Sequence, residues 1–142
     1  MSLFLPALDP ADAYDEALLA EVADYVVVQG YDLPYRTGPS AGPTAPVEGW
    51  DGLNLTRVLD RYHTLGVPPG KILLSLPLYG YEWPVTGAEP GVDTRGPGED
   101  LPWNAPEGVE PETPRARDQL RRHGGQRASM DDALWYSYLA DD

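Results

Sequence analysis

Carboxylates and aromatic side chains that could do chemistry follow two apolar runs of the sequence, 25–28 and 72–76. These candidates are Tyr31, Asp32, Tyr35, Tyr79, Tyr81, Glu82 and Trp83. A carboxylate can transfer a proton or bind a hydroxyl group, and an aromatic ring can stack on the apolar face of a sugar. The residue types therefore predict a site for a polar ligand at the ends of the two runs.

The elements that must position these residues are parallel strands joined by helices. The two runs consist of branched apolar residues without polar alternation, which is typical of buried strands in a parallel sheet, and we predict strands at 25–31 and 71–79. A shorter apolar segment at 2–8 predicts a third strand. Helical spacing predicts helices at 10–23, capped by Asp9, and at 54–65. This order predicts an α/β fold with a parallel sheet, whose sites lie at the C-terminal ends of its strands.

The second half of the chain has a different character. Residues 33–50 and 84–112 are rich in Pro and Gly, which predicts long loops. Thr113 begins a predicted helix that reaches about 122, and the β-prone run 134–139 ends at a turn whose second strand is absent from the sequence. We therefore expect a piece of a larger domain, with a segment at 1–83 and a second part at 84–142.

Composition excludes several classes of function. The 142 residues carry 10 Lys and Arg against 23 Asp and Glu, a formal charge of −13, which argues against nucleic-acid binding. There is no cysteine, and His63 and His123 lack partners at ligand spacing, so we expect no metal site and no cofactor. No apolar run approaches the roughly 20 residues that span a bilayer.

Two segments make the sequence resemble glycoside hydrolase family 18. They are QGYD at 29–32, with its Pro- and Gly-rich loop, and GVPPGKILLSLPLYGYEW at 66–83. The resemblance is strongest to the chitinase and spore-cortex-lytic branch. It implies a partial (β/α)₈ TIM barrel, about strands five to seven with their helices, plus the start of a small α+β insertion.

The resemblance also implies an activity and its residues. Family 18 enzymes hydrolyse glycans that contain N-acetylglucosamine, chitin or peptidoglycan, with retention, and the acetamido oxygen of the substrate acts as the nucleophile. Tyr31 and Asp32 would be catalytic, because they align with the family's MxYD motif, in which Gln29 replaces the methionine. The residues implied to bind substrate are Gln29, Tyr35, Tyr79, Tyr81, Glu82 and Trp83. The DxxDxDxE motif that carries the catalytic acid does not occur in this sequence, so we expect the chain alone to be inactive.

Several alternatives stay open from the sequence. Asp32 and Glu82 could form a conventional pair of catalytic carboxylates. The protein could instead be a non-catalytic lectin or a spore-envelope protein, or the chain could be a structural unit whose exposed sheet edges self-associate. We expect a glycan and the rest of a barrel as partners. The cellular location stays unknown, with secretion or attachment to the cell envelope as options for the parent protein.

Overall fold

A computed structural model describes residues 1–87, 91–102, 128–129 and 134–137. The chain divides into two compact units, one formed by 1–33 and 45–76, the other by 34–44 and 77–142. The predicted helix at 113–122 lies outside the described residues. The division predicted from the sequence, at 83 and 84, stays a prediction.

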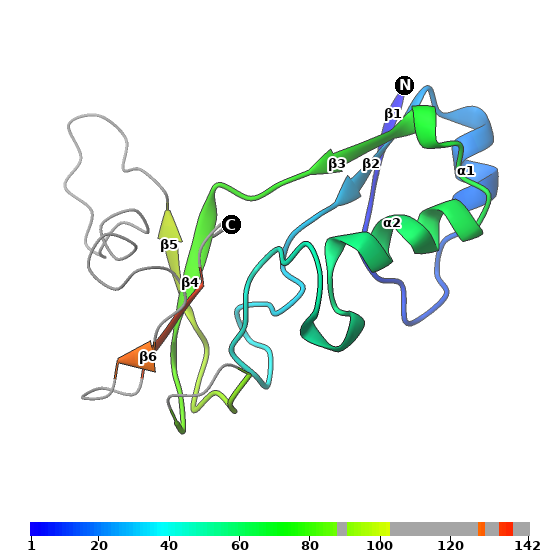
Figure 1. Ribbon diagram of the computed structural model, residues 1–142. Helices are drawn as coiled ribbons and strands as arrows, with labels where there is room; N and C mark the ends of the chain where they lie inside the picture. The colour runs from blue at the N-terminus through cyan, green and yellow to red at the C-terminus, as the bar shows by residue number, and fades with distance from the viewer. Residues whose placement is uncertain (88–90, 103–127, 130–133, 138–142) are drawn as a thin grey trace, which may run out of the picture. The chain divides into compact units, whose positions relative to one another are not determined.

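The first unit contains a three-stranded parallel sheet with two helices. Its strands β1 (Ser2–Leu5), β2 (Tyr25–Gln29) and β3 (Ile72–Ser75) are adjacent in that order. Helix α1 (Glu16–Val22) connects β1 to β2, and α2 (Leu55–Thr64) lies between β2 and β3 in the chain. Short 3₁₀ helices span Trp50–Gly52 and Pro69–Lys71. The predicted strand–helix–strand–helix–strand order is confirmed (Figure 1).

Both helices pack on the same face of this sheet (Figure 1). Alternate residues of β2, Val26 and Val28, are fully buried in a core that also contains Val58 and Tyr62 of α2. The apolar composition of these strands predicted that both faces of the sheet would be buried. On the face away from the helices, however, Phe4 of β1 and Leu73 of β3 remain about half exposed, at 55% and 47%.

Helix α1 is shorter than predicted. It begins at Glu16, with Asp15 as its N-cap accepting a hydrogen bond from the Leu18 N–H at 2.9 Å. The prediction that the helix begins at residue 10 was wrong because Asp9 instead caps a turn, where it accepts the Tyr14 N–H, and Asp12 has a φ of +49°. The start of α2 was predicted correctly, since Asn54 accepts the Arg57 N–H at 2.9 Å.

The predicted strand 71–79 ends early. Strand β3 stops at Ser75, and Tyr79–Pro84 form a separate strand, β4, in the second unit. Pro77 lies between the two strands and has no N–H to continue a ladder. The sequence predicted that the candidates at 79–83 lie at the C-terminal end of the parallel strand. They lie instead on a separate strand of the second unit.

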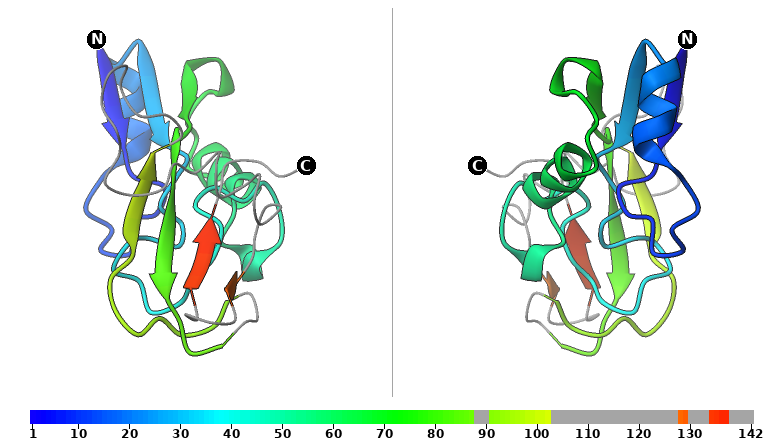
Figure 2. Two further views of the ribbon diagram at one scale, coloured as in Figure 1. Left: turned by 90° about the vertical axis from the view of Figure 1, so that its left-hand side faces the viewer. Right: turned by 90° about the vertical axis from the view of Figure 1, so that its right-hand side faces the viewer.

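The second unit contains an antiparallel sheet in the order β5-β4-β7-β6, formed by β4, β5 (Glu99–Pro102), β6 (Ala128–Ser129) and β7 (Leu134–Ser137). Figure 2 shows β5, β4 and β7 side by side. Two predictions are corrected here, because β5 lies within the predicted loop 84–112, and β7 does not lack a partner. Its partners β4 and β6 both precede it in the chain.

The segment Pro34–Thr44 also belongs to the second unit. Its backbone pairs with 91–94, where the Ala41 N–H donates to the Val92 carbonyl at 3.0 Å and the Thr94 N–H donates to the Pro39 carbonyl at 2.9 Å. The Pro- and Gly-rich loop after β2 thus has defined hydrogen-bond partners. Among the residues that the structure describes, no helix is long and apolar enough to cross a bilayer.

Candidate functional site

Tyr31 and Asp32 lie directly beyond the C-terminal end of β2, the central strand of the parallel sheet. The Gly30 N–H donates to the Ser75 carbonyl at 2.8 Å, which continues the pairing of β2 with β3 into the turn. Asp32 has a φ of +57°, a left-handed conformation that Asp tolerates better than most residues. Both side chains are half-buried, and the Tyr31 ring centroid lies 6.5 Å from that of Phe4. The structure therefore places these two candidates at the C-terminal ends of the strands, where parallel sheets bind ligands.

Gln29 supports this turn from the last position of β2. Its side-chain Nε2 donates a hydrogen bond to the Tyr31 carbonyl at 3.0 Å. Gln29, Tyr31 and Asp32 thus form one local group, brought together by a short stretch of backbone.

The candidates on β4 form a second group. Tyr79, Tyr81 and Trp83 alternate along the strand and share one face, with ring centroids 5.5 Å apart for the tyrosine pair and 5.1 Å apart for Tyr81 and Trp83. Tyr81 is 4% exposed and Trp83 is fully buried, whereas Tyr79 and Glu82 are half-buried. The accessible members of this group are therefore Tyr79 and Glu82.

Trp83 is held by the segment that follows Asp32 in the chain. Its indole Nε1 donates to the Arg36 carbonyl at 3.1 Å, and the same carbonyl accepts the Gly98 N–H at 2.8 Å. A Cβ added at Gly98 would lie only 2.7 Å from that indole nitrogen. The neighbouring candidate Tyr35 is half exposed, at 50%.

The eight sequence candidates thus fall into two groups. Gln29, Tyr31 and Asp32 belong to the first unit, and Tyr35, Tyr79, Tyr81, Glu82 and Trp83 belong to the second. The prediction that both groups share one rim stays a prediction, as does the pairing of Asp32 with Glu82.

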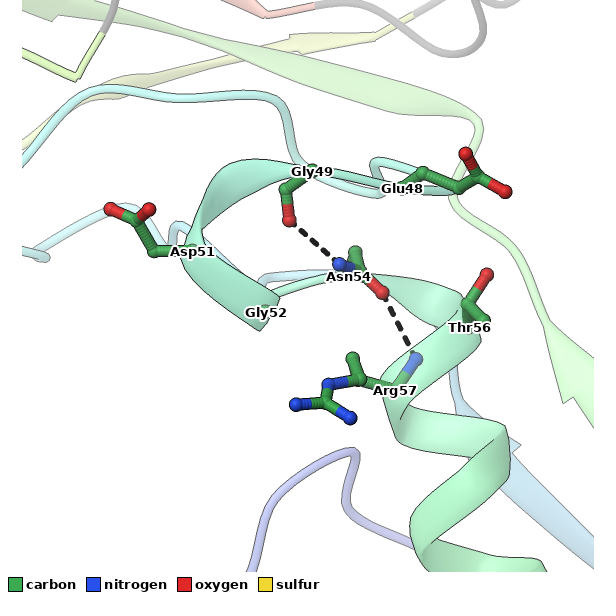
Figure 3. Close-up of a pocket in the computed structure, with 7 residues that line it drawn as sticks. All are labelled: Glu48, Gly49, Asp51, Gly52, Asn54, Thr56 and Arg57. Atoms are coloured by element: carbon green, nitrogen blue, oxygen red, sulfur yellow. Dashed lines mark hydrogen bonds between the residues drawn. The ribbon is translucent and has the colours of Figure 1, made fainter.

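An open pocket of about 430 Å³ lies at the N-terminus of α2, and sequence reasoning did not identify it (Figure 3). Its lining residues are Glu48, Gly49, Asp51, Gly52, Asn54, Thr56 and Arg57. Asn54 is nearly buried and bridges two backbone groups, because its Nδ2 donates to the Gly49 carbonyl at 2.6 Å while its Oδ1 accepts the Arg57 N–H (Figure 3). The only sequence signal was Asn54 as a helix cap, and these contacts fit that capping role.

The charged groups with clear pKa shifts lie outside the candidate groups. The Ala13 backbone N–H lowers the pKa of Asp9, and a hydrogen bond from the N-terminal amine lowers the pKa of Asp24. Burial raises the pKa of Tyr62 to about 12. Among the described residues, no group of three His, Cys, Asp or Glu side chains could hold a metal ion.

The model of glycosyl hydrolases family 18 matches residues 1–141. The chain belongs to this family. The resemblance found in the motifs around Tyr31 and Tyr79 is thereby confirmed.

Two curated relatives match about half of this chain. YdhD of Bacillus subtilis (strain 168), a proposed sporulation-specific glycosylase, is 31% identical over 70 residues, which are 49% of this chain and 15% of YdhD. The oviduct-specific glycoprotein of Ovis aries is 34% identical over 70 residues, 48% of this chain and 13% of that protein. The matched segments thus cover a small part of each relative.

Solved chitinases share the fold. Chitinase ChiA74 from Bacillus thuringiensis aligns with a TM-score of 0.73 at 14% identity, over 96% of this chain and 27% of the chitinase. A class V chitinase from Nicotiana tobaccum, solved in complex with NAG4, aligns with a TM-score of 0.73 at 16% identity, over 96% of this chain and 43% of its own. These likenesses show that this α/β chain has the fold of part of a chitinase.

Proposed function

We propose that the chain is part of a family 18 glycosidase that hydrolyses chitin-like glycans containing N-acetylglucosamine. It would supply about strands five to seven of a (β/α)₈ barrel, with the second unit as the start of an α+β insertion. The observation that carries the proposal is the position of Tyr31 and Asp32 beyond the central strand of a parallel sheet, in a chain of this family. Catalytic groups of (β/α)₈ barrels lie at that end of the strands.

The proposed chemistry is retaining hydrolysis assisted by the substrate. The acetamido oxygen of the sugar attacks the anomeric carbon while the glycosidic bond breaks, and the leaving oxygen takes a proton from an acid that the rest of the barrel would supply. Positive charge develops on the acetamido group until water opens the cyclic intermediate. The Tyr31 hydroxyl hydrogen-bonds this group and Asp32 stabilises it, so that both act on charge that appears in the transition state. Gln29, Tyr35, Tyr79, Tyr81, Glu82 and Trp83 would form or support the surrounding subsites, with Tyr79 and Glu82 the more accessible members of their strand.

A second candidate is a lectin-like protein that binds the same glycans without cleaving them. The residue that closes the DxxDxDxE motif in the complete protein separates the two candidates, because a glutamate there favours the enzyme and its replacement favours the lectin. Turnover by the complete protein distinguishes the two functions, whereas both predict binding of chitin oligosaccharides.

The test compares this chain with the complete protein that contains it. We expect the chain alone to release no fluorophore from a fluorogenic chitobioside, and the complete protein to do so. In the complete protein, Tyr31→Phe should lower kcat about tenfold or more, since it removes a hydrogen bond made to charge in the transition state.

The matched control is Tyr25→Phe, in which an exposed tyrosine at the other end of β2 loses its hydroxyl. Its kcat should equal that of the unmodified protein. A Tyr31→Phe variant with an unchanged rate would contradict the role of Tyr31, and binding without any turnover would favour the lectin.

A further inference from the structure

We propose that Gln29 is a positioning residue, which holds the Tyr31 backbone so that the phenol meets the substrate in one orientation. The inference rests on the proposed function of Tyr31. It differs from the role expected from the sequence, because Gln29 would act through the Tyr31 carbonyl and would not contact the glycan.

The first observation is the direction of the Gln29 hydrogen bond. Gln29 Nε2 lies 3.0 Å from the Tyr31 carbonyl oxygen. A carbonyl can only accept, so the amide must present its NH₂ group there. Gln29 is half-buried, and water therefore competes with this bond less than it would at an exposed site.

The second observation is that the backbone on both sides of Tyr31 is already restrained. Before it, Gly30 donates to the Ser75 carbonyl, and a Cβ at position 30 would lie 2.6 Å from that same oxygen. After it, Asp32 has a left-handed φ of +57°. Asp tolerates this conformation better than most residues, but it remains less favourable than the right-handed one and is kept here by the surrounding turn.

The Gln29 bond completes this restraint. It links the end of β2 to the carbonyl of the peptide group between Tyr31 and Asp32, and so spans Gly30 and Tyr31. Rotation of this peptide group would change the ψ of Tyr31 and the φ of Asp32, and so would shift the turn from which the Tyr31 side chain projects. Because a transition-state contact depends steeply on position, loss of the bond should lower the rate more than it weakens substrate binding.

Two substitutions in the complete protein test this. Gln29→Met keeps the length of the side chain but removes the donor. It should lower kcat about three- to tenfold, the factor expected for one neutral hydrogen bond, with KM changed less than about twofold. A residue that touched the glycan would instead raise KM.

Gln29→Glu adds a second measurement, the pH dependence of the rate, which would not change if Gln29 had a purely structural role. Its carboxylate has no proton to donate at pH 7, whereas the protonated acid can donate to the Tyr31 carbonyl again. The rate of the variant, divided by that of the unmodified protein at each pH, should rise as the pH falls toward about 4, near the ordinary pKa of Glu. The Gln29→Met ratio should stay constant over the same range.

The carbonyl ¹³C chemical shift of Tyr31 reports the same bond without catalysis. It should move in Gln29→Met and return in Gln29→Glu at low pH, while that of Ser75 stays in place. An unchanged shift, or rates that equal those of the unmodified protein, would overturn the proposal, as would a raised KM at constant kcat. If Tyr31→Phe also leaves the rate unchanged, the proposed function fails. If only the Gln29 variants have no effect, this inference alone fails.

Discussion

Removal of the Tyr62 hydroxyl should destabilise the protein and alter its response to alkali. Tyr62 lies on α2, is fully buried, and donates its O–H to the Pro6 carbonyl at 2.6 Å. Tyr62→Phe keeps the ring in the core but leaves the carbonyl without this donor. The substitution therefore removes a part-buried hydrogen bond between α2 and the segment after β1, together with the contact of the hydroxyl with Arg61.

The size of the effect follows from the lost hydrogen bond, which is part-buried. A net hydrogen bond contributes about 0.5–1.5 kcal/mol, and an unsatisfied buried acceptor costs about 1–3 kcal/mol. Because the hydrogen bond is part-buried, we expect Tyr62→Phe to lower the free energy of unfolding at pH 7 by about 0.5–1.5 kcal/mol. Urea denaturation followed by circular dichroism would measure it.

The pH dependence has a definite sign. Burial raises the pKa of Tyr62 from 10.0 to about 12, so the folded state favours the protonated phenol. The stability that Tyr62 contributes is fully present below pH 10 and is lost as the pH rises to about 12. A shift of this size corresponds to at most about 3 kcal/mol. The difference between Tyr62→Phe and the unmodified protein should therefore shrink over that pH range.

Tyr25→Phe is the control, because Tyr25 is 46% exposed and its loss of a hydroxyl should change stability by less than about 0.5 kcal/mol. The reasoning would be refuted if Tyr62→Phe were as stable as this control at pH 7. A stability difference that stayed constant between pH 9 and pH 12 would also refute it.

Two further substitutions test the packing of each unit. Glu16 is 3% exposed and pairs with Arg61 Nη2 at 2.5 Å. Glu16→Ala should lower the free energy of unfolding by about 2–4 kcal/mol in urea denaturation. This loss is smaller than for a fully buried ion pair, because Arg61 is 26% exposed. A loss below about 1 kcal/mol would contradict the prediction. Gly98→Ala should cost about 1–3 kcal/mol and shift the Trp83 indole N–H resonance, because the added Cβ would lie 2.7 Å from Nε1. Its control is Gly96→Ala, whose Cβ would make an ordinary 3.7 Å contact with Pro84, and equal melting temperatures for the two variants would count against the steric argument.

The parallel sheet could be predicted because its signals are local. Branched apolar runs define β2 and β3, and Asn54 defines the start of α2. The start of α1 could not be predicted, since Asp9 and Asp15 are both good caps and the choice depends on the turn at Asp12. The early end of β3 was marked by Pro77, but the aromatic residues beyond it suggested one continuous strand.

The antiparallel sheet could not be predicted because its pairing is distant in the sequence. Strand β4 pairs with β7, whose residues lie at least 50 positions later, and β5 lies in a stretch whose Pro and Gly content indicated a loop. The candidate turn at 29–32 was easier to predict, since all of its residues are contiguous. The hydrogen bond from Gln29 to the Tyr31 carbonyl could not be predicted, because it depends on the three-dimensional path of the turn.

The contrast between the two candidate groups has a physical origin in strand periodicity. Along β4 the spacing of two places Tyr79, Tyr81 and Trp83 on one face, which the sequence alone can show. Whether such a face meets a ligand or other protein atoms depends on what covers it. Here the Arg36 carbonyl, 47 residues earlier, accepts the Trp83 indole N–H. An aromatic run after an apolar strand therefore identifies where a glycan could bind, but only its packing decides which of the rings can touch one.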